Sequence, residues 1–169
     1  MTDRHPQPIV LDTTVCSNFA RTDAIDVLVT VLESPVVVSA VREEVEHGHA
    51  LGQDYLSSVV RAFDEGLPVA DPPATSRDIQ VDERLDAGEA ESLRCALERN
   101  GTLATDDLAA RRTADDLSVP VTGSVGILVF AVERRYIDRS TADSWLDTWR
   151  DERGYYAPVR SVSEMFESR

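Results

Sequence analysis

Short apolar segments alternate with segments of helical periodicity along the chain, and this alternation restricts the folds open to it. Four apolar segments, "PIVLDT", "PVVVSA", "TLAT" and "VPVTG", have the length of strands. The segments between them carry apolar residues three or four positions apart, which is typical of amphipathic helices. The three consecutive valines at 36–38 predict a strand that is covered on both faces. The order predicts a three-layer α/β/α sandwich with a central parallel sheet.

The helix and strand boundaries can be predicted from capping and turn residues. Ser39 and Ser140 are expected to be helix N-caps, and "LPVA" at 67–70 is expected to be a short edge strand. The segment "DPPATSRD" at 71–78 is expected to be a loop because it holds two prolines. Helices are expected at 24–34, 40–48, 51–63, 86–101, 106–117, 124–135 and 140–154. The chain has no repeat or linker, so residues 1–169 are expected to form one domain.

The charge composition excludes one class of nucleic-acid-binding protein. Acidic residues number 31 against 17 basic ones, for a net charge of −14, and all the basic residues are arginine. The acids are spread along the chain, which indicates adaptation to high salt, where charge repulsion is screened. An acidic protein from an ordinary environment is the alternative. Either reading argues against a broad basic face for nucleic acid, but not against a nuclease that meets phosphate through metal ions.

Two further features concern the cellular compartment. No apolar run reaches the length of about 18 residues that a membrane helix needs. The first residues, "MTDRHPQP", lack the hydrophobic region of a signal peptide, so a cytoplasmic location is expected. Cys16 and Cys95 form no metal or redox spacing and are expected to be buried thiols rather than a disulfide.

Acidic residues follow the predicted strands at the places where a parallel sheet binds its ligands. Asp12 ends the first strand, and ligands of open α/β sheets bind beyond the carboxyl ends of the strands. Carboxylates gathered there repel one another, and a divalent cation relieves the repulsion. Mg²⁺ or Mn²⁺, which prefer oxygen ligands, could position and activate a water for attack on a phosphodiester. The candidate catalytic and metal-binding residues are Asp12, Glu44, Glu89, Asp106 and Asp107.

Four motifs in order resemble those of the PIN-domain nucleases, and among them the VapC-like toxin ribonucleases. "IVLDTTVCSNFAR" resembles the family's first strand, with its acid at Asp12 and an asparagine at Asn18. "VVVSAVREEVEHG" resembles the segment with the second acid, and the aliphatic residue after it favours Glu44 over Glu43. "DAGEAESLRCALERNGTLATDDLAARRTA" resembles a subgroup with further acids in "GEAEA" and "DD…AR" motifs, and "VPVTGSVGILVFAVERRYI" continues the pattern. The resemblance is strongest over residues 8–150.

The resemblance implies a Mg²⁺- or Mn²⁺-dependent endoribonuclease. It also implies an RNA substrate, a small antitoxin protein as partner and a homodimer, with no membrane association. A catalytically silent PIN-like binding module and an RNA-processing nuclease outside a toxin pair remain as alternatives. A phosphotransferase of the haloacid-dehalogenase type is disfavoured, because Asp12 is followed by Thr13 and Thr14 instead of the Asp-x-Asp motif.

Each candidate acid also has an ordinary structural interpretation. Asp12 could close a turn after its strand, and Glu44 could be a solvated helix residue. Glu89 could form a capping box with Asp86, three positions earlier. Asp106 could be the N-cap of a helix that begins at Asp107, so that one of these two acids caps and the other coordinates.

Four polar residues nearby are open to two interpretations as well. Arg111 and Arg112 could contact an RNA phosphate or could form surface ion pairs. The hydroxyls of Thr105 and Ser124 could contact a water on the metal or could cap helices.

Overall fold

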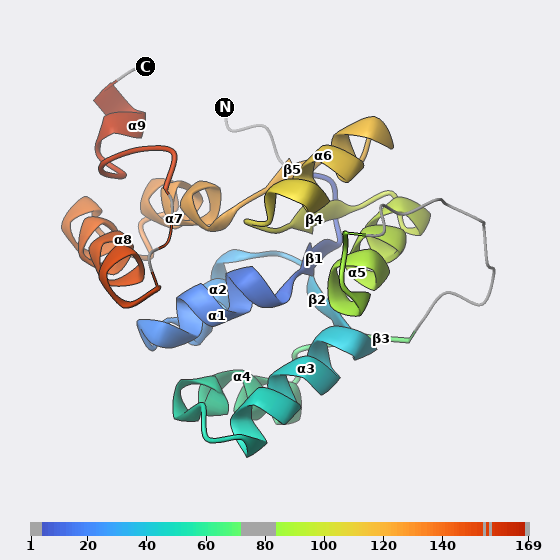
Figure 1. Ribbon diagram of the computed structural model, residues 1–169. Coiled ribbons are helices and arrows are strands. Elements are labelled where there is room, and N and C mark those ends of the chain that lie inside the picture. The colour runs from blue at the N-terminus through green and yellow to red at the C-terminus, as the bar shows by residue number, and fades with distance from the viewer. Residues whose placement is uncertain (1–4, 72–83, 154, 156, 168–169) are drawn as a thin grey trace.

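A five-stranded parallel sheet forms the centre of the molecule (Figure 1). The computed structural model describes residues 5–71, 84–153, 155 and 157–167. The strand order is β3-β2-β1-β4-β5, and every adjacent pair is parallel. The strands are β1 (Ile9–Leu11), β2 (Pro35–Val38), β3 (Val69–Ala70), β4 (Thr102–Ala104) and β5 (Val121–Thr122). The predicted parallel α/β architecture and the short edge strand at 67–70 are therefore confirmed.

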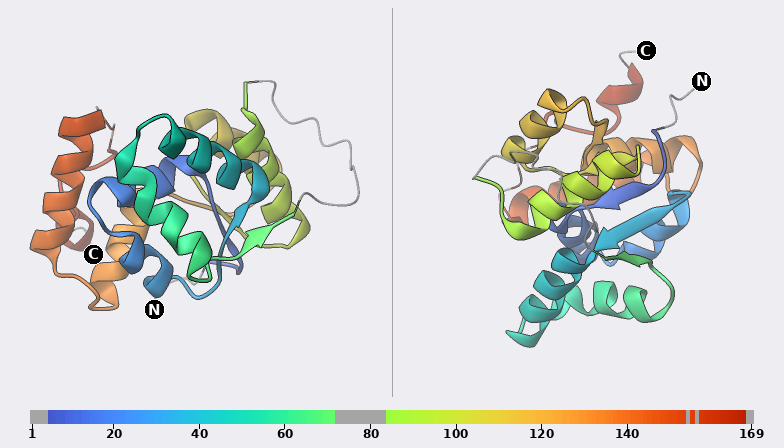
Figure 2. Two further views of the ribbon diagram at one scale, coloured as in Figure 1. Left: turned by 90° about the horizontal axis from the view of Figure 1, so that it is seen from below. Right: turned by 90° about the vertical axis from the view of Figure 1, so that its right-hand side faces the viewer.

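Helices cover both faces of the sheet and give the molecule three layers. α5 and α6 lie on one side, and α1, α2 and α7 lie on the other (Figure 1). α8 packs on α1 and α7 and lies on the side away from α5 (Figure 2). The helices are α1 (Thr13–Arg21), α2 (Ile25–Val31), α3 (Ser39–Ala50), α4 (Ser57–Asp64), α5 (Ala87–Glu98), α6 (Leu108–Asp116), α7 (Ser124–Glu133), α8 (Arg139–Arg153) and α9 (Glu164–Glu167), with a 3₁₀ helix, η1, at Asp54–Leu56.

The N-terminus of α3 is capped from another helix, which corrects the expected role of Ser39. Ser39 is the first residue of α3, and Val38 takes the cap position without a capping side chain. The carboxylate of Glu91, from α5, accepts the Ala40 amide at 3.0 Å and the Ser39 hydroxyl at 3.3 Å. This tertiary contact replaces the local cap and fixes α3 beside α5. The helix also continues past Gly48, where a stop was expected.

Other boundaries also differ from the sequence-based expectation. The side chain of Asp138, rather than Ser140, accepts the Thr141 amide at 2.7 Å near the start of α8. The helix expected over 51–63 begins only at 54, as the 3₁₀ helix η1, because Gly52 has a φ of 99° that ends the preceding turn. The loop expected at 71–78 lies, after its first residue, outside the described residues.

Buried side chains account for the packing of the layers. The three strand residues Ile9–Leu11 are buried, and Trp149 of α8 is buried with its ring 5.1 Å from that of Phe19. Cys16 and Cys95 are buried free thiols, as the sequence predicts. Within the described part of the chain, no helix has the length and apolar character needed to cross a membrane.

The strand order fixes where a ligand can bind. Because β2 and β4 flank β1, the chain reverses its winding direction at β1, and in folds of this kind ligands bind beyond the carboxyl ends of the strands at such a point. The amide of Asp12, directly after β1, donates to the carbonyl of Ala104 at the end of β4, at 2.9 Å. The acids that follow these two strands are therefore brought to the same edge of the sheet.

Candidate acidic active site

A cleft at the carboxyl end of the sheet gathers three of the five predicted acids. Asp12 comes from the end of β1, Glu44 from α3 and Glu89 from α5. The cleft has a volume of about 220 Å³. Its lining residues are Asp12, Thr13, Thr14, Ser17, Glu44, Val45, Gln53, Tyr55, Leu56, Asp86 and Glu89. No arginine or lysine is in this lining, so the described wall of the cleft is acidic and neutral.

Asp12 is only 2% exposed and is held by three donors. Its Oδ1 accepts the Thr13 amide at 2.8 Å, and its Oδ2 accepts the hydroxyls of Thr105 at 2.8 Å and Thr14 at 3.2 Å. Burial raises the pKa of Asp12 to about 6, because the three hydrogen bonds only partly offset the cost of removing the charge from water. The expected role at a turn is also present, since the same side chain caps α1.

Glu44 lies at the exposed side of the cleft. Its Oε2 accepts the Thr13 hydroxyl at 2.9 Å, so one threonine side chain lies between Glu44 and the Asp12 turn. A Cβ on Gly88 would lie 3.0 Å from this Glu44 oxygen, which shows how closely α3 and α5 approach at the cleft. Glu43, the neighbouring acid on α3, is exposed and is not part of the cleft lining.

Glu89 combines the two roles that the sequence left open. It forms the capping box with Asp86: its amide donates to Asp86 at 2.8 Å, and its Oε2 accepts the Asp86 amide at 3.0 Å. It also lines the cleft. Partial burial raises the pKa of Glu89 to about 7, and the negative charges of Asp86, Asp107 and Asp12 contribute to the increase. Its cap therefore does not remove it from the acidic site.

Asp106 and Asp107 point to different neighbours. Asp107, and not Asp106, is the N-cap of α6: its Oδ1 accepts the Ala110 amide at 2.8 Å, and the helix begins at Leu108. One of the two acids caps the helix, as the sequence allowed, but it is Asp107 and not Asp106. Both lie outside the cleft lining, and Asp106 accepts hydrogen bonds from Asn18, Ser124 and Tyr155.

The nearby hydroxyls and arginines orient these acids. Thr105 donates its hydroxyl to Asp12 and accepts the Asp107 amide at 3.1 Å, so it connects both acids. Arg111 donates to the carbonyl of Thr105 at 2.9 Å, while Arg112 is exposed. These contacts favour roles in positioning for Thr105 and Arg111.

The donor set fits a hard divalent cation in its chemistry. Oxygen ligands suit Mg²⁺ or Mn²⁺, and burial, with a smaller contribution from neighbouring acids, raises the pKa of both Asp12 and Glu89. Each carboxylate has about four acceptor sites. In the described structure, one oxygen of Glu44 accepts from Thr13 and one oxygen of Glu89 accepts from the Asp86 amide. The described residues contain no cluster of three His, Cys, Asp or Glu side chains already arranged as a metal site.

A family model described as a PIN domain matches residues 8–168, nearly the whole chain. The chain belongs to the PIN-domain family. Proteins of this family are typically nucleases, acting on RNA or DNA, and generally use divalent metal ions. No curated protein matches the chain. The acids from β1, α3 and α5 lie at the edge of the sheet where doubly wound folds bind their ligands.

Sequence reasoning missed several residues around the acids of this PIN domain. Thr13 and Thr14 contact Asp12 and Glu44, and their position directly after the strand acid was the available signal. Tyr55 lines the cleft from η1, which the sequence placed inside a longer helix. Tyr155 contacts Asp106 from the C-terminal segment, for which no pattern predicted a structure.

Proposed function

We propose that this PIN-domain protein is a Mg²⁺- or Mn²⁺-dependent endoribonuclease that hydrolyses RNA phosphodiesters. Asp12, Glu44, Glu89 and the pair Asp106–Asp107 form its acidic site. The observation that carries the proposal is the single cleft lined by Asp12, Glu44 and Glu89, from three separate elements of the fold. A bound cation would neutralise charge on the phosphodiester and prepare a water for in-line attack.

The residues of the chain hold the carboxylates ready for such a cation. Thr14 and Thr105 donate to one oxygen of Asp12, and Thr13 donates to Glu44, so the orientations of two carboxylates are fixed before an ion binds. Asp12 is buried, so its charge is poorly screened by water and attracts a cation strongly. Among the described residues that line the cleft none is cationic, so neutralisation of the RNA phosphate at this point would fall to the metal ion.

The acidic composition leads to a proposal about salt. Binding of nucleic acid through basic side chains weakens steeply as salt rises, because it depends on the release of counterions. Direct contact between a metal ion and a phosphate oxygen does not depend on a basic surface. A net charge of −14 with no lysine is typical of a protein that works in high salt. We therefore expect cleavage to persist at molar KCl.

The similarity to VapC-like ribonucleases extends the proposal to the cellular role. The protein would be the toxin of a toxin–antitoxin pair, cytoplasmic, restrained by a small antitoxin protein and dimeric. A small open reading frame beside its gene, whose product binds this chain and inhibits cleavage, is the expected observation. Normal growth on expression of the active chain alone would instead favour an RNA-processing nuclease.

The experiment compares two neighbouring glutamates on one helix. Glu44→Gln should abolish the cleavage of a labelled single-stranded RNA in Mn²⁺ or Mg²⁺, because it removes a carboxylate from the cleft. Glu43→Gln makes the same change of charge on an exposed residue outside the cleft and should retain activity. Excess EDTA should stop the wild-type reaction, and a matching DNA strand tests the choice of nucleic acid.

Two outcomes would contradict the proposal. Cleavage that continues in excess EDTA would exclude the metal-dependent mechanism. A well-folded wild-type protein that neither binds Mn²⁺ in a calorimetric titration nor cleaves RNA would favour the silent binding module. Equal activity of Glu44→Gln and Glu43→Gln would show that Glu44 is not part of the active site.

A further inference from the structure

Asp106 is surrounded by donors from three distant parts of the chain. Its Oδ2 accepts the Asn18 amide group at 3.1 Å and the Ser124 hydroxyl. Its Oδ1 accepts the Ser124 backbone amide at 2.9 Å and the Tyr155 hydroxyl at 3.1 Å. These four donors use the approximately four acceptor sites of a carboxylate. Asp106 can therefore bind a cation only by giving up a hydrogen bond.

Tyr155 is held in place from both sides. Its ring meets Trp149 edge-on, with centroids 6.0 Å apart and an interplanar angle of 89°, and Trp149 is itself packed on Phe19 of α1. Burial and the nearby charge of Asp106 raise the pKa of the Tyr155 phenol, so the hydroxyl stays protonated and remains a donor. The phenol is thus a fixed donor directed at Asp106.

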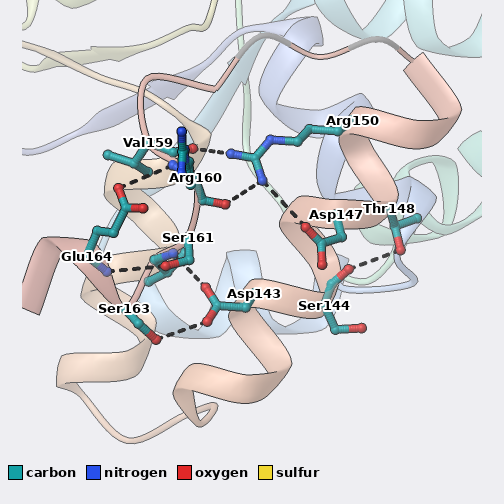
Figure 3. Close-up of polar contacts among 11 residues, drawn as sticks. Asp143, Ser144, Asp147, Thr148, Arg150, Val159, Arg160, Ser161, Ser163 and Glu164 are labelled. Atoms are coloured by element: carbon teal, nitrogen blue, oxygen red, sulfur yellow. Dashed lines mark hydrogen bonds and ion pairs between the residues drawn. The ribbon is translucent and has the colours of Figure 1, made fainter.

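The chain after Tyr155 is fastened to α8. The guanidinium of Arg150 donates to the carbonyls of Val159 and Arg160 (Figure 3). Asp143 accepts the Val162 amide at 2.6 Å and the Ser163 hydroxyl at 2.9 Å (Figure 3). These contacts hold the C-terminal segment against the helix whose Trp149 packs on Tyr155.

The turn at residues 105–107 links Asp106 to the acids of the cleft through hydrogen bonds. Thr105 donates to Asp12 on one side of Asp106. Asp107, on the other side, donates its amide to the Thr105 hydroxyl at 3.1 Å and caps α6. The amide of Asp106 also donates to the Thr14 hydroxyl at 3.1 Å. A displaced Asp106 would therefore move its neighbours on both sides.

We propose that Tyr155 is a positioning residue of the acidic site that acts through Asp106: with Asn18 and Ser124, its hydroxyl saturates the acceptor sites of Asp106 and fixes the turn at 105–107, from which the Thr105 hydroxyl donates to Asp12. This inference rests on the proposed function for its cation. Its geometric part, the fixing of the turn by Tyr155, can be tested whether or not the protein is a nuclease.

The experiment uses the full chain and the variant Tyr155→Phe, which removes one hydroxyl and keeps the ring on Trp149. Hydrogen exchange, read by NMR in metal-free buffer, should be about tenfold faster at the backbone amides of Asp106, Asp107 and Ser124, because a hydrogen bond to a charged acceptor is lost. Mn²⁺ affinity, measured by calorimetry, should fall several-fold. RNA cleavage should lose kcat with little change in KM.

The control variant Asp143→Ala removes only the contacts with Val162 and Ser163; the Arg150 contacts, which hold the chain nearer to Tyr155, and Asp106 itself keep their partners. It should lower the melting temperature while leaving exchange at the three amides and Mn²⁺ affinity close to wild type. If the two variants changed amide exchange and Mn²⁺ affinity equally, Tyr155 would only stabilise the C-terminal segment, and the proposal would be overturned. Unchanged exchange in Tyr155→Phe would overturn it as well.

Accelerated exchange in Tyr155→Phe, together with a wild type that binds no Mn²⁺, would support the positioning role and would contradict the proposed function instead.

Discussion

The buried carboxyl of Asp12 should make stability depend on pH in a way that one substitution removes. Its pKa in the folded protein is about 6, raised by burial from the ordinary value of 3.8. Between these two pH values the folded state binds more protons at Asp12 than the unfolded state does. The contribution of Asp12 to the free energy of unfolding is therefore greatest below about pH 4 and is lost as the pH rises to about 6 and above.

The size of this loss follows from the shift. A shift of one pKa unit corresponds to about 1.4 kcal/mol, so a rise from 3.8 to about 6 corresponds to roughly 3 kcal/mol. The conversion is appropriate because Asp12 is only 2% exposed, so water screens it little. In Asp12→Asn the group no longer titrates, and this part of the pH dependence should disappear.

Urea unfolding of both proteins in EDTA between pH 4 and pH 8 gives the measurement. The difference between the free energies of unfolding of wild type and Asp12→Asn should change by about 2.4 kcal/mol over this range, which covers most of the titration, in the direction that favours the variant at high pH. Comparing the difference cancels the titration of the other carboxylates. A difference that stays constant would show that Asp12 is ionised at no cost in the fold and would refute the reasoning.

Saturating Mn²⁺ at pH 8 provides the second part of this test. A ligand that binds only the folded state at 100 times its Kd stabilises it by about 2.7 kcal/mol. Wild type should gain stability from the ion, and Asp12→Asn should gain much less. Equal gains would place the ion elsewhere on the protein.

Three further expectations concern the scaffold of the site. Gly101→Ala should lower the free energy of unfolding by about 1–3 kcal/mol in urea titrations, because the added Cβ would lie 2.3 Å from the carbonyl oxygen of Pro8; a neutral effect would contradict this contact. Glu91→Ala should lower the free energy of unfolding by about 1 kcal/mol, because it removes the carboxylate that caps the Ala40 amide. An unaltered melting temperature in far-UV circular dichroism would show that the cap is unimportant. Cys16 should resist an aromatic disulfide reagent at pH 8 in the native protein and react in urea, because burial raises its pKa to about 12; rapid native labelling would disprove its burial.

The layered fold could be predicted from the sequence because its signals are local. Consecutive valines at 36–38 and the alternation of strand and helix patterns require a parallel sheet with both faces covered, wherever the strands lie in its order. The capping box of Asp86 and Glu89 was also readable, since its two residues are three positions apart. Helix starts that depend on another part of the chain could not be predicted in this way. Ser39 was expected to cap α3, but Glu91, 52 positions away, takes that role.

The candidate site likewise has features that the sequence predicts and features that depend on the tertiary structure. The sequence alone determined which acids follow the strands, because Asp12, Asp106 and Asp107 are marked by the apolar residues before them. Only the tertiary structure decided how each is used. Burial sets the pKa of Asp12, Asp107 takes the cap of α6, and Tyr155, 49 residues along the chain, occupies Asp106. The physical reason is that a residue's type and local spacing are written in the chain, whereas its solvation and its hydrogen-bond partners depend on segments that only the folded packing brings beside it.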